Sequence, residues 1–361
     1  MRIWVPFNLH RWEVRKMDIQ DKMLLSMIQG FSLSYFLYTS CELGIFETLL
    51  NEDQTLSELS ERLYIRKDIL LRLMNTLEAF GFVKIHDEKY SLQQLGKRLS
   101  EKNGKVMREL LLFSGRQCMP YWAKLYEAVH SGEAPYKLIE KQAYFDMQET
   151  NYQNYRTFNS MMSSNSEDLD LQPYFETEIT PFRIKKIVDI GGGTGNILIK
   201  LLKFYKNSFG ILLDLQFVET EAIRNLQNYN MENRVKFYSG NFFEPIDFSA
   251  DIFVMSRILH DWSDEEAIQI LKNVAQAMTE NSRILIIEKI MPETPKRENT
   301  EMYMADLNMW VMCGGKERTL EEFKNLLQLS DLKVTRIIKL AGNESVLEVK
   351  KYIINYQEGM I

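Results

Sequence analysis

A short glycine-rich stretch, residues 186–195, constrains the fold more than any other part of the sequence. It reads KIVDIGGGTG, so that β-branched residues are followed by glycines and then by a helical pattern from 197 to 204. This order predicts a buried strand, a tight loop and a helix. Because glycine has no Cβ, such a loop brings backbone N–H groups and a helix N-terminus close to a ligand. We therefore expect a nucleotide-like ligand at this loop.

The spacing of the glycines narrows the identity of that ligand. Gly191, Gly193 and Gly195 do not form the G-x-G-x-x-G pattern of dinucleotide sites, and no Gly-Lys-Ser/Thr follows for a P-loop. The next strand-like run, 209–214, ends at Asp214, a carboxylate placed to bind the two ribose hydroxyls of an adenosine. A glycine loop and a ribose-binding acid without phosphate-binding residues indicate S-adenosylmethionine (SAM). The alternative is a glycine turn that only tightens strand–helix packing.

The length and patterning of the chain predict more than one domain. At 361 residues the chain exceeds one comfortable core, and after residue 183 strands and helices alternate. Alternation predicts an α/β, Rossmann-like fold with a parallel sheet covered on both faces, and a final hairpin-like pair predicts one antiparallel edge strand. The expected parts are a flexible arm at 1–17, a winged-helix dimerisation domain at 18–100, a helical, substrate-lining region at 101–182 and a SAM-binding catalytic domain at 183–361.

Residues 55–92 read as a helix, a turn, a second helix and two short strands, which is a winged-helix arrangement. DNA binding would require a basic, polar face on the second helix, predicted at 67–80, but leucine, isoleucine and methionine dominate it. The chain as a whole carries 44 basic and 50 acidic residues, a formal net charge of −6, which argues against a nucleic-acid partner. We therefore expect dimerisation or closure over a substrate.

Cysteine usage and hydropathy predict a cytoplasmic protein. Cys41, Cys118 and Cys313 are widely separated and form no C-x-x-C pattern, so they are interpreted as reduced thiols. Residues 23–41 carry no charge but include too many polar side chains for a membrane span. We expect a helix buried between subunits there.

His260 is the predicted general base. It follows a strand predicted at 250–255, at the edge where open α/β sheets bind ligands. Methyl transfer from a sulfonium to a phenol of pKa about 10 requires a base within hydrogen-bond reach, and histidine, of pKa about 6.5, is suited to that role. Glu288 and Glu317 are the candidates to hold the other ring nitrogen.

No metal is predicted. There is no H-x-x-x-H pattern, and the sequence shows no ligand cluster around His260. Asp261 and Asp264 are interpreted as residues of a helix start, where acidic side chains are favoured.

Taken together, these motifs resemble the metal-independent, SAM-dependent O-methyltransferases, a family that includes plant caffeate and flavonoid enzymes, hydroxyindole enzymes and bacterial natural-product enzymes. The resemblance covers about residues 20–350. It is carried by VDIGGGTG at 188–195, DL at 214–215, GNFF at 240–243, LHDWS at 259–263, IE at 287–288 and GGKERT at 314–319. It implies a class I methyltransferase sheet, SAM as donor with S-adenosylhomocysteine (SAH) as product, a homodimer joined by the N-terminal domain, and a His260 base flanked by Glu288 and Glu317.

Two positions depart from the family pattern. Asn241 replaces an aspartate at the adenine edge, and Ser256 replaces a lysine, for which Arg257 is expected to substitute. The expected cofactor-binding residues are Asp189, Gly191, Gly193, Asp214, Leu215, Asn241, Phe242, Ser256 and Arg257. The expected substrate-binding residues, in an adaptable apolar pocket, are Phe158, Met162, Met309 and Trp310.

Three functions are compatible with these features. The leading hypothesis is O-methylation of a small aromatic or polyketide-like natural product. A second is a SAM-binding relative that catalyses decarboxylation or rearrangement, suggested by Asn241 and Ser256. A third is a SAM-sensing regulator that binds DNA through residues 55–92.

Overall fold

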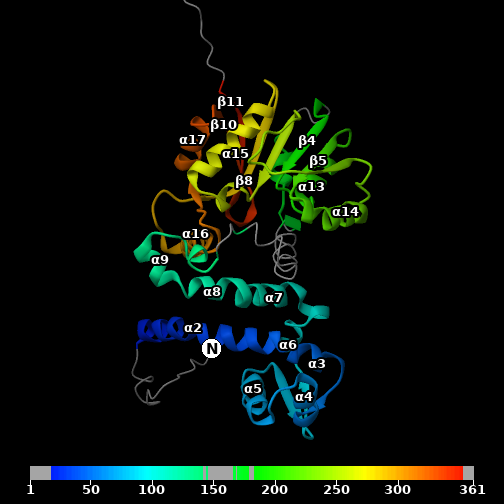
Figure 1. Ribbon diagram of the computed structural model, residues 1–361, viewed down its shortest axis with the longest axis vertical. Coiled ribbons are helices and arrows are strands. Elements are labelled where there is room, and N and C mark those ends of the chain that lie inside the picture. Colours follow the sequence, from blue (N-terminus) through cyan, green and yellow to red (C-terminus); the bar gives the residue numbers. More distant parts are fainter. Residues whose placement is uncertain (1–17, 141–143, 145–165, 168, 179–182, 353–361) are drawn as a thin grey trace, which may run out of the picture. The chain divides into compact units, whose positions relative to one another are not determined.

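The computed structural model describes residues 18–140, 144, 166–167, 169–178 and 183–352, which fall into two compact units (Figure 1). One unit contains the described residues up to Pro120, and the other contains the described residues from Tyr121 onward. The predicted arm at 1–17 and the predicted substrate-binding residues Phe158 and Met162 lie outside the described residues.

The first unit is a long helix followed by a winged helix and a second long helix. Thr55 and Glu58 form a capping box that starts one of its short helices, and Leu70, Met74 and Leu77 are buried at helical spacing along the next. The elements are α2 (Ile19–Glu42), α3 (Ile45–Asn51), β1 (Gln54–Thr55), α4 (Leu56–Leu63), α5 (Lys67–Ala79), β2 (Val83–His86), β3 (Lys89–Leu92), α6 (Gln94–Lys97), α7 (Glu101–Phe113), a π-helical turn (Ser114–Cys118) and α8 (Met119–Trp122), whose last residues open the second unit. The strands pair antiparallel in the order β1-β3-β2, so the predicted winged helix is present.

Helix α2 exposes several large apolar side chains. Met27, Ile28 and Phe31 are 62%, 67% and 65% exposed. Apolar surface of this kind marks a protein-interaction site. None of the described helices is long and apolar enough to span a membrane.

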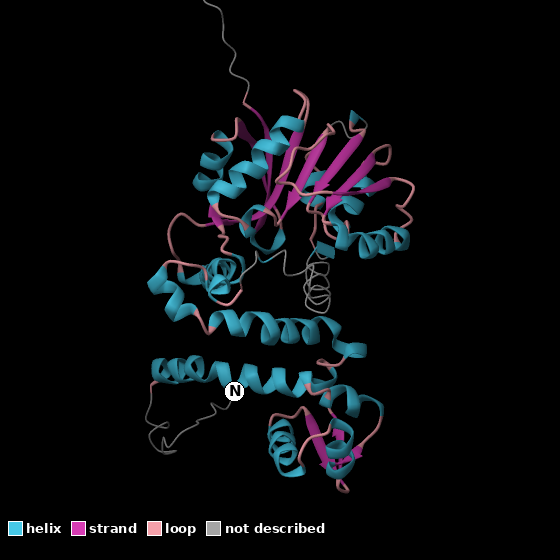
Figure 2. Ribbon diagram, in the orientation of Figure 1, coloured by secondary structure: helices cyan, strands magenta, loops and turns pink. Residues whose placement is uncertain are grey.

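The second unit is built on one large sheet (Figure 2). Its strand order is β10-β11-β8-β7-β4-β5-β6, and the short strand β9 pairs with β8 beyond this path. The strands are β4 (Lys186–Ile190), β5 (Phe209–Asp214), β6 (Val235–Ser239), β7 (Ile252–Ser256), β8 (Arg283–Met291), β9 (Arg318–Thr319), β10 (Leu332–Lys339) and β11 (Glu344–Lys351). Its described helices are α9 (Leu125–Ser131), α12 (Gln172–Phe175), α13 (Asn196–Phe204), α14 (Glu219–Asn228), α15 (Asp264–Ala277), α16 (Thr300–Cys313) and α17 (Leu320–Gln328), with short 3₁₀ turns between some of them.

Neighbouring residues of the central strands face opposite layers, as the period of a strand requires. Ile187 of β4 packs into a core with α13 and α14, whereas Val188 packs into a second core with α15 and α17. Both faces of the sheet are therefore covered, which is why four consecutive residues of β4, 187–190, are buried instead of alternating between buried and exposed.

The antiparallel strand lies one position further in than predicted. β11 pairs antiparallel with both β8 and β10, so β10 runs parallel to β8 and forms the edge. The reason is burial: the first six residues of β11 are all buried, while β10 alternates between exposed and covered positions. A strand covered on both faces is favoured inside a sheet, and an alternating charged strand is suited to its edge.

Candidate active site

The glycine loop joins β4 to α13 and follows the conformation that its sequence predicts. Gly191, Gly193 and Gly195 have φ angles of 64°, 56° and 82°, a region that favours glycine. A Cβ at Gly193 would meet no atom within 4 Å, whereas one at Gly191 would lie 2.6 Å from the side chain of Ile258. Open space therefore lies in front of Gly193, where a ligand can approach the backbone.

Two acids lie beside this loop, Asp214, which is partly buried, and Asp189, which is fully buried. Asp214, at the end of β5, accepts hydrogen bonds from the N–H of Gly193 at 2.7 Å and of Leu215 at 2.7 Å. Burial raises the pKa of Asp214 to about 6, although these two N–H groups lower it. Asp189 is fully buried, and its burial together with the nearby charge of Asp214 raises its pKa to about 8. The loop, the space before it and the free lone pairs of Asp214 fit the adenosine and methionine parts of SAM.

The remaining predicted cofactor-binding residues lie around the same sheet edge, with different roles in the fold. Phe242 packs beside Gly191, where an added Cβ would lie 3.3 Å from its ring. Asn241 is exposed, and its Oδ1 accepts from the N–H of Phe243. Ser256 ends β7, and the guanidinium of Arg257 pairs with the buried carboxylate of Glu344 on β11.

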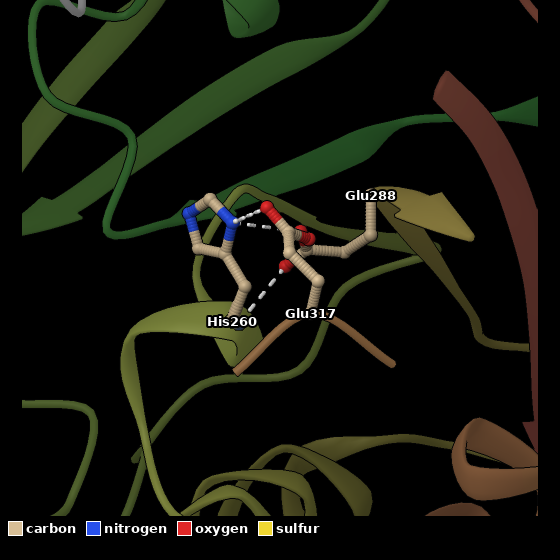
Figure 3. Close-up of side chains that lie close together, drawn as sticks. All are labelled: His260, Glu288 and Glu317. Carbon is tan, nitrogen blue, oxygen red and sulfur yellow. Dashed lines mark hydrogen bonds and ion pairs between the residues drawn. The ribbon is translucent and has the colours of Figure 1, made fainter. Parts of the chain in front are cut away.

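His260 lies on a 3₁₀ turn after β7, directly before the capping box of Ser263 and Glu266 that starts α15. Figure 3 shows two carboxylates beside its Nδ1. Glu317 Oε1 lies 3.2 Å from Nδ1 and Glu288 Oε2 lies 3.6 Å from it. The fold therefore brings together the three residues that the sequence predicted as catalytic.

The carboxylates control the charge of His260. Burial disfavours its charged form, but the carboxylates of Glu288, Asp261 and Glu317 more than offset this and raise the pKa of His260 to about 10. Burial raises the pKa of Glu288 to about 7. Glu317 is also buried, yet its hydrogen bond to His260 and the imidazolium charge hold its pKa below the usual value.

A second loop fixes the His260 turn in place. Arg318 is fully buried and donates to the carbonyl oxygens of Leu259 at 2.6 Å and Trp262 at 2.8 Å. The N–H of Lys316 donates to the carbonyl of His260 at 2.9 Å. Gly315 allows this approach, because a Cβ there would lie 2.0 Å from the same carbonyl oxygen.

The structure corrects two interpretations of the sequence. Asp261 does not belong to the helix start, since Ser263 is the N-cap. Oδ1 of Asp261 lies 3.6 Å from Nε2 of His260, and burial raises the pKa of Asp261 to about 6. A cluster of potential metal ligands does surround His260, because its ligand atom and those of Glu288 and Glu317 lie within 4.8 Å of one another. Sequence spacing could not indicate this, since the three residues come from three separate segments.

Only one of the two described residues of the predicted acceptor pocket, both on α16, lines a pocket in the structure. Trp310 lines a surface pocket of about 470 Å³, whereas Met309 does not. The residues of this pocket are Ser263, Asp264, Glu265, Asp306, Leu307, Trp310, Gly314, Gly315 and Lys316. The neighbouring Asn308 accepts a hydrogen bond from the indole N–H of Trp122 at 3.0 Å.

Comparison with known proteins identifies the class to which this fold and site belong. The O-methyltransferase domain family matches residues 122–331, more than half of the chain, and the O-methyltransferase dimerisation domain matches residues 25–102. The chain therefore belongs to the O-methyltransferase family. Within it, the chain is a SAM-dependent O-methyltransferase, and the predictions of SAM as donor and of a dimerisation domain are confirmed.

Several relatives are similar over nearly their whole length. Phenazine O-methyltransferase PhzM of Lysobacter antibioticus is 27% identical, covering 91% of this chain and 96% of its own. The mitomycin biosynthesis 6-O-methyltransferase of Streptomyces lavendulae is 27% identical, covering 92% and 95%. Among solved structures, the mitomycin 7-O-methyltransferase MmcR has a TM-score of 0.81 at 26% identity, covering 92% and 98%. The O-methyltransferase NcsB1, bound to SAH and 1,4-dihydroxy-2-naphthoic acid, has a TM-score of 0.76 at 25% identity, covering 88% and 96%.

Proposed function

We propose that this enzyme methylates a hydroxyl group on a small aromatic natural product and that His260 is its general base. The observation that carries the proposal is the hydrogen bond from Nδ1 of His260 to Glu317. A carboxylate accepts hydrogen bonds, so this contact places a proton on Nδ1 and leaves Nε2 of the neutral ring as the proton acceptor. Relatives named for phenazine and mitomycin substrates, and NcsB1 bound to a dihydroxynaphthoic acid, support an aromatic acceptor.

The charges around His260 suit proton removal from a phenol. When bound, SAM supplies the electrophilic methyl group. A phenol has a pKa of about 10, and the carboxylates raise the pKa of His260 to about 10, so transfer of the proton between them costs little free energy. Glu288 accepts from the backbone N–H groups of Leu259 and His260, which fixes the ring relative to the sheet edge. The residues placed to hold SAM are the glycine loop and Asp214.

The test uses 1,4-dihydroxy-2-naphthoic acid first, followed by other two- and three-ring phenols, with SAH release and methylated product measured together. His260→Ala and His260→Gln should lower turnover by about 10² or more while leaving SAM affinity unchanged. His130→Ala, at an exposed histidine of α9, is the matched control. Unchanged turnover in the His260 variants would contradict the base role, and failure of every phenol would contradict the acceptor class.

We infer that the protein forms a homodimer through its N-terminal domain. The exposed apolar residues of α2 and the dimerisation-domain match support this. Light scattering should show a dimer that is weakened by Phe31→Glu or Ile28→Glu and retained in Gln20→Glu, at an exposed polar position of the same helix. A monomeric wild-type protein would contradict the inference.

We further infer a cytoplasmic location and the domain limits 18–100, 101–182 and 183–361. Three free thiols support the location. The α/β alternation that begins at β4 supports the last limit. Cell fractionation and limited proteolysis would test the two inferences, and secretion or cleavage within 190–340 would contradict them.

A further inference from the structure

The three residues around Nδ1 of His260 have a second chemical capacity. Each offers a ligand atom that metals bind in proteins, one imidazole nitrogen and two carboxylate oxygens. The side chains of Glu288 and Glu317 are only 1% and 3% exposed, and that of His260 is 15% exposed. Within the part of the chain that the structure describes, no other group of three such residues has its ligand atoms this close together.

The two distances from Nδ1 to the carboxylates match those of a tetrahedral zinc site, and the two carboxylate oxygens lie within 4.8 Å of each other. Zn²⁺ binds nitrogen and carboxylate oxygen at about 2.0–2.2 Å, which in a tetrahedron separates the ligand atoms by about 3.3–3.6 Å. Nδ1 lies 3.2 Å from Glu317 Oε1 and 3.6 Å from Glu288 Oε2. An ion can therefore be held with only small side-chain movements, and the fourth position is left for water.

Two oxygens in the triad lack a hydrogen-bond partner among the described residues. They are Glu288 Oε2 and Glu317 Oε2, and both are buried. Figure 3 shows both carboxylates turned toward the imidazole. A buried carboxylate oxygen without a hydrogen bond loses solvation that a cation would restore.

The surrounding structure holds these ligands in position. Glu288 Oε1 accepts from the N–H groups of Leu259 at 3.0 Å and His260 at 3.4 Å, which leaves Oε2 facing the ring. The backbone N–H of Glu317 donates to Asp306 at 2.9 Å. Such supporting hydrogen bonds orient metal ligands in known sites.

We propose that His260, Glu288 and Glu317 form an inhibitory binding site for Zn²⁺ and similar divalent transition ions. The ion binds Nδ1 in place of its proton, which passes to solvent, and binds one oxygen of each carboxylate. A neutral imidazole bound through Nδ1 carries its proton on Nε2, so Nε2 has no lone pair with which to accept another. The bound ion therefore blocks the proton acceptor. Ion binding stands on the geometry alone, whereas inhibition rests on the proposed role of His260.

Co²⁺ is a suitable probe, because tetrahedral Co²⁺ absorbs visible light and takes the place of Zn²⁺ in such sites. Full-length protein in chelator-free buffer should bind one equivalent of Co²⁺ with a tetrahedral spectrum, and added Zn²⁺ should abolish that spectrum. Glu288→Gln and Glu317→Gln should weaken Co²⁺ binding at least tenfold. Glu265→Gln, at an exposed carboxylate near the site, should leave it unchanged. Circular dichroism checks that each variant is folded.

The result separates this proposal from others. A Co²⁺ spectrum that persists in both folded triad variants would overturn the site. A spectrum that disappears in Cys313→Ser would also overturn it, because Cys313 Sγ lies 3.8 Å from Asp261 and offers a competing ligand. Absence of Co²⁺ uptake would also overturn it. Zn²⁺ that binds as described without slowing methyl transfer would retain the ion site and overturn both inhibition and the base role. If His260→Ala loses activity and the wild-type protein takes up no Co²⁺, the base role is retained and the ion site is overturned.

Discussion

Replacing Arg318 with lysine tests whether the His260 turn is held by a single buried side chain. The guanidinium reaches three acceptors at once: the carbonyl oxygens of Leu259 and Trp262, and the carboxylate of Asp264 at 3.0 Å. Lysine keeps the charge but has a single nitrogen on a flexible stem and cannot reproduce this planar arrangement of donors. At least one carbonyl loses its partner, and both do if the ammonium stays with Asp264.

The magnitude follows from the groups left without partners. A buried acceptor that loses its hydrogen bond costs about 1–3 kcal/mol, so the loss of unfolding free energy is about 1–3 kcal/mol for one carbonyl and about 2–6 kcal/mol for both. The pair with Asp264, whose side chain is 46% exposed, adds little. For a domain of this size even 2 kcal/mol lowers Tm by about 4–8 °C. Because Arg318 sets the position of the turn, a displacement of about 1 Å at His260 would also lower kcat by up to about 10².

Calorimetry measures Tm, and SAH release measures kcat at saturating substrates and the KM for SAM in a titration of SAM. Arg318→Lys should lower Tm and kcat with little change in the KM for SAM. Arg62→Lys, at a side chain that is 50% exposed and paired with Glu52, is the matched control and should resemble the wild type. A folded Arg318→Lys enzyme with wild-type Tm and kcat would refute the reasoning, since it would show that the turn holds its geometry without these hydrogen bonds.

Three further predictions follow from the site. Gly315→Ala would place a methyl group 2.0 Å from the His260 carbonyl oxygen, so kcat should fall at least tenfold. The control Gly30→Ala, whose methyl group would meet no atom within 4 Å, should leave kcat unchanged. Equal kcat values of the two variants would contradict the prediction. The carboxylate of Asp214, of pKa about 6, has to be ionised to accept hydrogen bonds from the ribose hydroxyls. Calorimetry should therefore show SAM binding about tenfold weaker at pH 5 than at pH 7.5, and Asp214→Asn should remove that pH dependence. A SAM affinity of the wild type that is constant over this pH range would contradict the assignment. Because a base acts unprotonated and the pKa of His260 is about 10, kcat should rise about tenfold from pH 7 to 8, and a rate independent of pH would contradict this proton balance.

Local patterns in the sequence were sufficient to predict most of the fold. The strand at 209–214 begins and ends where predicted, and the helix predicted over 197–204 begins one residue earlier, because periodicity and glycine placement act within a few residues. The position of β11 was not predictable in the same way. It depends on which free edge of the sheet the strand pairs with, and that is set by burial contributed from distant segments.

The candidate site, like the fold, was predictable from the sequence only in part. His260, Glu288 and Glu317 were predictable as candidates because the sequence pattern put each of them at one edge of the sheet, although β8 continues past Glu288 to Met291. Arg318 was missed, since a charged residue beside two others reads as exposed, and only the fold shows that it is fully buried against Leu259 and Trp262. The GGKERT motif at 314–319 was the available signal, but it pointed to Glu317 alone.

The place of β11 in the sheet affects how the protein is made. Strand β8 leaves the ribosome dozens of residues before its partner β11, and until then one of its edges has no strand to pair with. Unpaired, apolar strand edges are where nascent chains associate wrongly. β11 also supplies Glu344, which holds Arg257 three residues before His260. The loop that carries His260 is therefore completed only when this late strand docks, so an unfinished chain is expected to depend on chaperones and to have no methyltransferase activity.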